Sequence, residues 1–183
     1  MHITAAITAG GKSRRFGSDK ALYRVGQHTL LEVAARNLHA CNQRLIIGPY
    51  ALRNWQTLPD PAPGVGPISG LVAALEHAEN GWVFFTGVDM PQLDAHYWSH
   101  LNHHLHPDVQ VVVPLNEQGR MEVLAAAYHV SALPELKAAL QERRYGIRRV
   151  IEEKLLYHTL AGVPQHHFKN VNTPQDTLDL MES

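Results

Sequence analysis

Short apolar runs alternate along the chain with segments in which apolar residues recur every three or four positions. Runs of four to eight apolar residues predict buried strands, and the wider spacing predicts amphipathic helices. The predicted strands cover 3–8, 44–48, 82–88, 109–113, 122–130 and a segment near 155–161. The predicted helices cover 29–40, 68–78, 93–105, 132–144, 146–155 and a short final stretch at 173–181.

This alternation of strands and helices predicts an α/β fold. Strands joined through helices form βαβ crossovers, and their sheet is mostly parallel with helices on both faces. We therefore expect a three-layer α/β/α sandwich with a mostly parallel, Rossmann-like sheet, built as a single domain over 1–183. Ligands of such open sheets bind beyond the carboxyl ends of the strands, so the loops that follow strands are the first place to search for a site.

Composition excludes several classes of function. The net charge is −1 and the pI is near 6.9, which argues against a general binder of nucleic acid or of anionic membranes. No run approaches the about 20 apolar residues of a membrane span, and the first residues lack the pattern of a signal peptide, so we expect a cytoplasmic protein. Cys41 is the only cysteine, which rules out an internal disulfide.

Histidine is unusually frequent, with thirteen residues in the chain. His96 and His100 are four residues apart, and two more histidines follow, so one helix face could present several imidazoles. No acidic residue completes an H-E-x-x-H pattern and no cysteine joins the group, so we favour a solvated helix face over a metal site. We give the same interpretation to the pair His166 and His167.

A cationic loop follows the first predicted strand. Its sequence, AGGKSRRFGSDK, combines two adjacent glycines with four cations, which are Lys12, Arg14, Arg15 and Lys20. Glycines let an anion approach the main chain, and arginine binds two phosphate oxygens at once. A surface turn with solvated cations is the alternative. Charge clustered directly after a buried strand favours phosphate binding.

The same loop is similar to a P-loop motif, because residues 6–13 read A-x-x-x-x-G-K-S, with alanine in place of the first glycine of the motif. In a P-loop the helix begins at the lysine and buries apolar residues at once. Here SRRFGSDK stays polar, contains Gly17, and helical periodicity starts only at about Thr29. A kinase or NTPase built on Lys12 and Ser13 therefore remains the weaker alternative.

Four motifs in order resemble the MobA-like nucleotidyltransferases, whose best-known members are the molybdenum cofactor guanylyltransferases. They are TAGGKSRRFGSDK from Thr8, GPISGL from Gly66, VDMPQL from Val88 and NVNTPQD from Asn170. The resemblance covers nearly the whole chain. It implies an enzyme that transfers GMP from GTP to the phosphate of molybdopterin and releases pyrophosphate. The implied partners are GTP, molybdopterin and transient partners of cofactor biosynthesis or apoenzymes.

The resemblance also assigns roles to single residues. Arg15 and Lys20 are the candidates for holding the triphosphate, and Lys20 matches the nucleotide-binding lysine of the family. An ion pair with the neighbouring Asp19 is the alternative role of Lys20. The main chain of Thr8, Ala9 and Gly10 matches the nucleotide contacts. Gly66 lets the nucleoside approach the backbone, and Asp60 corresponds to a residue that contacts GTP. A carboxylate at Asp60 can accept the two N–H donors that distinguish guanine from adenine.

Asp89 follows the most apolar predicted strand, so its carboxylate should emerge at the carboxyl edge of the sheet. Mg²⁺ typically takes one or two carboxylates together with substrate phosphates, and Asp89 matches the metal-binding Asp of the family. A helix N-cap is the alternative role, which we assign to Asp94 instead. Asn170 and Asn172 match active-site amides, and Asn172 or Thr173 could in addition cap the last helix.

Rival functions also fit these motifs. Related enzymes use CTP or another phosphate acceptor, and a non-catalytic nucleotide sensor or cofactor carrier is a further rival. A second cationic group at 143–149 is either a solvated helix end or a pocket for the pterin phosphate.

Overall fold

The computed structural model describes residues 1–10 and 19–177. Within these ranges the chain forms a central sheet in the spatial order β5 (Gln56–Leu58), β4 (Gln43–Ile47), β1 (Ile3–Thr8), β6 (Trp82–Gly87), β8 (Ala125–His129), β7 (Val111–Pro114) and β9 (Tyr157–Leu160). Neighbouring strands are parallel except β8, which is antiparallel to both β6 and β7. The predicted mostly parallel sheet is confirmed.

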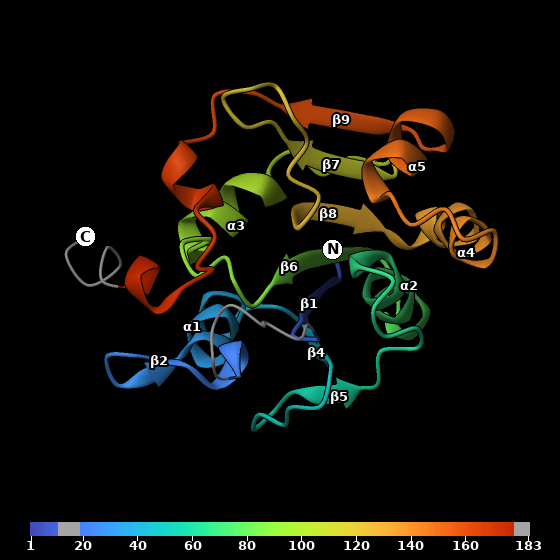
Figure 1. Ribbon diagram of the computed structural model, residues 1–183. Coiled ribbons are helices and arrows are strands. Elements are labelled where there is room, and N and C mark those ends of the chain that lie inside the picture. The colour runs from blue at the N-terminus through green and yellow to red at the C-terminus, as the bar shows by residue number, and fades with distance from the viewer. Residues whose placement is uncertain (11–18, 178–183) are drawn as a thin grey trace.

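Helices cover both faces of this sheet (Figure 1). One face carries α1 (Leu30–Asn37) and α3 (Ala95–Asn102), and the other carries α2 (Pro67–His77), α4 (Leu133–Gln141) and α5 (Ile147–Lys154). Successive strand residues point to opposite faces, so Phe84 of β6 packs in the core under α1 and α3, and Phe85 packs in the core under α2, α4 and α5. The predicted three-layer sandwich is confirmed.

The structure adds elements that the pattern did not predict. They are the strand β5, the hairpin of β2 (Arg24–Val25) and β3 (His28–Thr29), and the 3₁₀ helices η1 (Lys20–Leu22), η2 (Val130–Ala132) and η3 (Gln165–Phe168). Elements of two to four residues are too short to show a hydrophobic period. The predicted final helix over 173–181 is a 3₁₀ helix, η4 (Pro174–Thr177), in its described part, and 178–181 lies outside the described residues.

Side-chain caps fix where two of the helices begin. Thr29 accepts a hydrogen bond from the Glu32 N–H while the Glu32 carboxylate accepts from the Thr29 N–H, which is a capping box at α1. The Asp94 carboxylate accepts from the Tyr97 N–H at 2.8 Å and caps α3, as predicted. Among the helices of the described ranges, none is long and apolar enough to cross a membrane.

Three strands end level with one another at one edge of the sheet. Thr8 of β1 lies between Ile47 of β4 and Gly87 of β6 in register. Because these strands are parallel, the loops that leave them start side by side at this carboxyl edge. Helix α2 packs closely here, since a Cβ on Gly70 would lie 3.2 Å from the Thr8 hydroxyl oxygen. The lack of a side chain at Gly70 thus lets α2 pack closely on β1.

Candidate functional site

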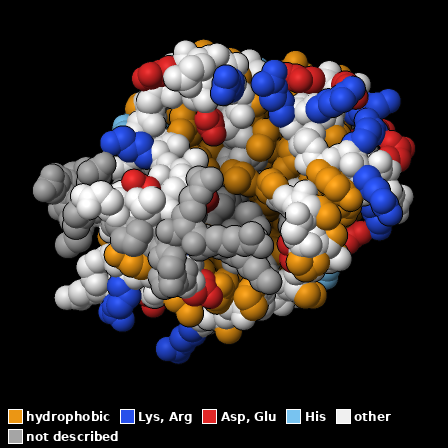
Figure 2. Space-filling view, viewed as in Figure 1, with side chains coloured by type: hydrophobic (Ala, Val, Ile, Leu, Met, Phe, Trp, Pro, Cys, Tyr) orange, Lys and Arg blue, Asp and Glu red, His pale blue; other side chains and the backbone are white. Residues whose placement is uncertain are grey.

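A cavity of about 220 Å³ opens at the carboxyl edge of the sheet. It lies beyond the ends of β1 and β6 and beside the start of α2, and in the view of Figure 2 hydrophobic side chains border the hollowed centre of this face. Its walls come from five segments of the chain: Thr8, Ala9, Gly10, Asp19, Lys20, Ala21, Asp60, Gly64, Gly66, Pro67, Gly87, Val88, Asp89 and Leu124. This set contains the predicted nucleotide contacts of the described residues, which are Thr8, Ala9, Gly10, Lys20, Asp60, Gly66 and Asp89.

Three polar side chains converge at the cavity. The Lys20 ammonium donates to Asp89 Oδ2 at 3.2 Å and to Asn172 Oδ1 at 3.1 Å. These residues are 69 and 152 positions apart along the chain, so only the fold brings them together. Lys20 and Asp89 thus lie close enough together for both to contact one nucleotide. Arg15, which we predicted beside them, lies outside the described residues.

Two features position Asp89: a hydrogen bond to its main-chain carbonyl group and the lack of a side chain at Gly87. The Val171 N–H donates to the Asp89 carbonyl oxygen at 2.8 Å. A Cβ on Gly87 would lie only 2.4 Å from Asp89 Oδ1, so the carboxylate occupies space that any other residue at position 87 would fill. The side chain of Asp89 keeps 28% of its exposure while that of Lys20 keeps 11%. The carboxylate is thus accessible to a ligand in the cavity.

The Lys20 backbone is positioned by Asp19, whose carboxylate caps η1 by accepting from the Ala21 N–H at 3.2 Å. The Tyr50 hydroxyl, which comes from the loop after β4, donates to the same carboxylate. Burial, as the larger cause, and the adjacent Asp19 carboxylate, as the smaller one, raise the pKa of Tyr50 to about 12. This hydroxyl therefore remains a donor. Sequence reasoning missed Tyr50, although its place directly after a predicted strand could have indicated it.

The two late asparagines are in different surroundings. Val171 is 2% exposed, and the residues on either side of it are both exposed, which agrees with the alternation that we predicted. Neither asparagine is among the residues that line the cavity, but Asn172 contacts Lys20, which does line it. The structure therefore brings Asn172 to the site through Lys20.

Asp176 fixes the segment that carries Asn172. Its carboxylate accepts from the Asn172 N–H at 2.7 Å and from the Thr173 N–H at 2.9 Å, and the Thr173 hydroxyl accepts from the Asp176 N–H at 3.4 Å. Hydrogen bonds from the Asn172 and Thr173 amides lower the pKa of Asp176. This residue was also missed, but the spacing T-x-x-D from Thr173 is a capping-box signal that could have revealed it.

A wider hollow of about 830 Å³ continues from the cavity between the loops after β4 and β5. Asp60 and Gly10 line both spaces, and Asp60 Oδ1 accepts from the Ala62 N–H at 3.0 Å. The Asp60 carboxylate thus faces the Gly10 main chain, since a Cβ on Gly10 would lie 3.7 Å from Oδ2. Gly66 lines the first cavity with φ 103°, a conformation that favours glycine, and precedes the first residue of α2.

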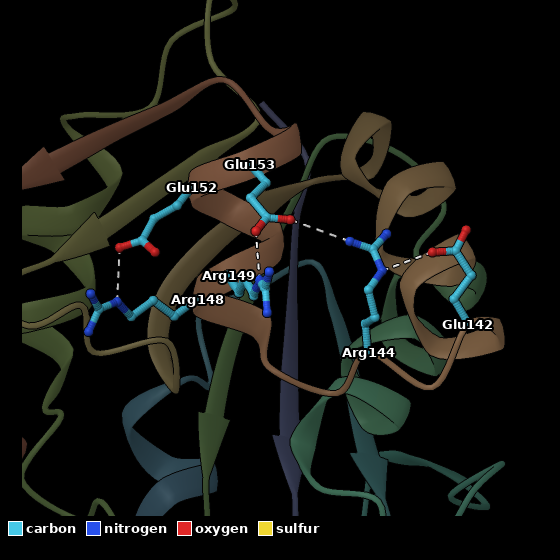
Figure 3. Close-up of polar contacts among 6 residues, drawn as sticks. All are labelled: Glu142, Arg144, Arg148, Arg149, Glu152 and Glu153. Atoms are coloured by element: carbon cyan, nitrogen blue, oxygen red, sulfur yellow. Dashed lines mark hydrogen bonds and ion pairs between the residues drawn. The ribbon is translucent and has the colours of Figure 1, made fainter.

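The second cationic group does not line this cavity. Its arginines lie around the end of α4 and on α5, and Figure 3 shows three of them, Arg144, Arg148 and Arg149, paired with glutamates of the same segments. Arg144 pairs with Glu142 and Glu153, Arg148 with Glu152, and Arg149 with Glu153. The arrangement supports a solvated helix over a pocket for the pterin phosphate.

The histidines on α3 and directly after it form a largely exposed group, as predicted. His96, His100 and His103 are exposed, and the His104 ring lies 4.9 Å from that of His100 and 6.1 Å from that of His158. In the described ranges no group of three His, Cys, Asp or Glu side chains could hold a metal ion. Our interpretation of His167 is wrong, however. Its side chain is only 6% exposed, and its Nδ1 hydrogen-bonds to the Gln92 carbonyl oxygen at 2.7 Å. This bond satisfies the buried ring nitrogen.

Comparison with known proteins shows the family to which this chain belongs. A protein of Deinococcus radiodurans described as a probable molybdenum cofactor guanylyltransferase is 44% identical over 98% of this chain and 94% of its own length. The crystal structure of molybdopterin-guanine dinucleotide biosynthesis protein A from Archaeoglobus fulgidus superposes with a TM-score of 0.79 and 22% identity, over 98% of this chain and 97% of that one.

The same fold occurs in 2-C-methyl-D-erythritol 4-phosphate cytidylyltransferase from Thermus thermophilus, with a TM-score of 0.76, 17% identity and full coverage of both chains. At such identities the likeness of the two solved structures shows the fold alone. The sequence model of the MobA-like NTP transferase domain matches residues 5–160, which include most of the strand β1 as well as Lys20, Asp60, Gly66 and Asp89. With that match over most of the chain and a relative at 44% identity, the protein belongs to the MobA-like NTP transferase family.

Proposed function

We propose that the protein is a guanylyltransferase that transfers GMP from GTP to the phosphate of molybdopterin and releases pyrophosphate. The observation that carries this proposal is the convergence of Lys20, Asp89 and Asn172 at a cavity bordered by the main chain of Thr8, Ala9 and Gly10. The name of the 44% identical relative supports the guanylyl donor and the molybdenum cofactor acceptor.

In the proposed reaction an oxygen of the acceptor phosphate attacks the α-phosphorus of GTP. The bond from the α-phosphorus to the bridging oxygen of the β-phosphate breaks, and the electron pair leaves with pyrophosphate. Such transfers depend mainly on positioning the two groups in line and on neutralising charge. Lys20 supplies a cation at the cavity, and its contacts to Asp89 and Asn172 hold it in place before the nucleotide binds.

Mg²⁺ fits the oxygen donors at this position. Asp89 and Asn172 both direct a side-chain oxygen at the Lys20 ammonium, so the site is built to surround a cation, and the Asp89 carboxylate is the group that we propose as the metal ligand. A set of one carboxylate with neutral oxygens is typical of Mg²⁺ bound together with substrate phosphates. When bound, the ion would neutralise charge on the triphosphate.

The remaining assignments belong to the same proposal. Arg15 and Asn170 complete the catalytic set, and Asp60 and Gly66 contact the nucleoside. GTP and molybdopterin are the substrates, the enzyme acts in the cytoplasm, and transient partners receive or deliver the cofactor. The fold shared with a cytidylyltransferase makes CTP the donor to test beside GTP.

The test is product analysis with purified protein, molybdopterin, Mg²⁺ and either GTP or CTP. We expect pyrophosphate and the guanine dinucleotide from GTP. Asp89→Asn and Lys20→Met should each lower turnover by about 10²-fold or more, because each removes a charge at the reacting phosphates. Asp108→Asn, which changes an exposed carboxylate, is the matched control. Formation of GDP or CDP, with or without inorganic phosphate, in place of pyrophosphate, or full turnover in Asp89→Asn, would overturn the proposal.

A further inference from the structure

The C-terminal segment 165–172 is attached to the loop that carries Asp89. Two main-chain carbonyl groups of that loop accept hydrogen bonds from the segment. The Asp89 oxygen accepts from the Val171 N–H at 2.8 Å, and the Gln92 oxygen accepts from His167 Nδ1 at 2.7 Å. Asn172, which contacts Lys20, directly follows Val171. The two attachments therefore fix the position of Asn172 relative to Asp89.

The rest of the loop is anchored from the helices beneath it. The Asn37 side-chain amide of α1 donates to the Pro91 oxygen at 3.2 Å, and the Trp98 indole N–H of α3 donates to the Leu93 oxygen at 3.0 Å. These anchors hold the loop on the sheet but do not reach the C-terminal segment. The side chains of Asn37, Trp98 and His167 donate to main-chain carbonyl groups of this loop. Of these three, His167 is the one that joins the loop to the segment bearing Asn172.

The His167 ring is fixed on several sides. It is 6% exposed, its centroid lies 5.2 Å from the Tyr97 ring, and the His166 ring lies 4.1 Å away. Tyr97 is itself fixed, because its hydroxyl donates to the Ala125 carbonyl oxygen of β8. A carbonyl oxygen only accepts, so His167 Nδ1 must carry the hydrogen. Both the packing and the hydrogen bond therefore require one orientation of the ring.

We infer that His167 is a positioning residue, which sets the distance between Asn172 and Asp89 by tying the C-terminal segment to the Gln92 carbonyl. The inference rests on the proposed function, because it assigns His167 a role in the geometry of that same site. Without this bond, Val171 and Phe168 would still pack in the core, so the protein would fold while the segment gained freedom at the cavity. Small displacements of this kind lower turnover much more than they lower stability.

The chain offers a matched set of variants at position 167. An asparagine places its Nδ2 donor where His167 has Nδ1, two bonds from Cβ, whereas a glutamine carries the same amide one bond further out. We expect His167→Gln and His167→Leu to lower kcat about tenfold with little change in the KM for GTP, and His167→Asn to restore most of kcat. His96→Leu, at an exposed histidine of α3, should leave kcat unchanged.

Hydrogen–deuterium exchange at the Val171 amide provides a readout that needs no substrate. We expect this amide to exchange about five- to tenfold faster in His167→Gln and His167→Leu than in the wild type, as the loss of one hydrogen bond produces, and His167→Asn to stay near the wild type. Equal exchange or equal kcat in the Asn and Gln variants would overturn the inference. An inactive wild type with the expected exchange pattern would instead overturn the proposed function and leave the positioning role standing.

Discussion

Gly87 lets the Asp89 carboxylate fold back over the end of β6. A Cβ at this position would lie 2.4 Å from Asp89 Oδ1, which is the movable end of a side chain and not part of the backbone. Gly87→Ala should therefore displace the carboxylate without disturbing the strand. We expect kcat to fall about tenfold and the free energy of unfolding to change by less than about 1 kcal/mol, measured by steady-state kinetics and urea denaturation.

Gly146→Ala is the control for that substitution. A Cβ added at Gly146 would lie 3.9 Å from the nearest atom, and this residue precedes α5, away from the cavity. Both measurements should match the wild type in this variant. Normal turnover in Gly87→Ala would show that the orientation of the Asp89 carboxylate does not matter for the reaction.

Single residues also mark what the sequence could and could not predict. Lys20, Asp89 and Asn172 were identified because each belongs to a motif that resembles the family. Tyr50 and Gly87 act through contacts with those residues, and such contacts depend on how loops from separate strands pack. His167 was misjudged for the same reason, because only the packing of η3 against α3 shows that its ring is buried.

At the scale of the element, the two capping boxes should have different consequences. Thr29 caps α1, and the capping residues do not line the cavity. Thr29→Ala should lower the free energy of unfolding by about 1 kcal/mol, because the first N–H groups of the helix lose their acceptor, and should leave kcat unchanged. Thermal unfolding and steady-state kinetics measure both quantities. A loss of turnover larger than the loss of folded protein would connect α1 to the site.

The cap of η4 is different because Asp176 bonds to the Asn172 N–H. The pKa of Asp176 is lowered, so its stabilising effect is present above the unfolded pKa of about 3.9 and is lost as the pH falls through the folded value. Asp176→Ala should lower the melting temperature by a constant amount between pH 5 and 8, and the difference from wild type should shrink below about pH 4. Asp108→Ala, at an exposed carboxylate, is the control, and a difference that persists unchanged at pH 3 would contradict the assignment.

The elements themselves were predictable where the pattern was long. The apolar runs of β1, β4 and β6 and the periodic α2 were identified with every end within one residue, since burial on one or two faces dictates their composition. β5 and the hairpin of β2 and β3 were not, because two or three residues carry no period. The antiparallel direction of β8 also leaves no trace in its own sequence, as it is set by the connections on either side.

On the scale of the whole molecule, sheet order creates the site. β1 lies in the sheet between β4 and β6, so the loops that follow these three strands meet at one edge. The C-terminal segment returns across that edge through the bond from Val171 to Asp89 and adds Asn172. Separate stretches of chain thus contribute to one cavity, and ligand binding should stabilise the fold as a whole.

That coupling makes thermal unfolding a test of base selectivity. A ligand at about 100 times its Kd stabilises the folded state by about 2.7 kcal/mol, which for a chain of this size raises the melting temperature by about 5 to 10 °C. We expect GTP with Mg²⁺ to give this shift and ATP, CTP and UTP to give less. Asp60 lines the cavity and its carboxylate can accept both N–H donors of guanine, whereas an amide offers one acceptor and one donor, which suits adenine. Asp60→Asn should therefore reduce the shift with GTP and increase that with ATP, and a larger shift with CTP than with GTP in the wild type would contradict guanine selectivity.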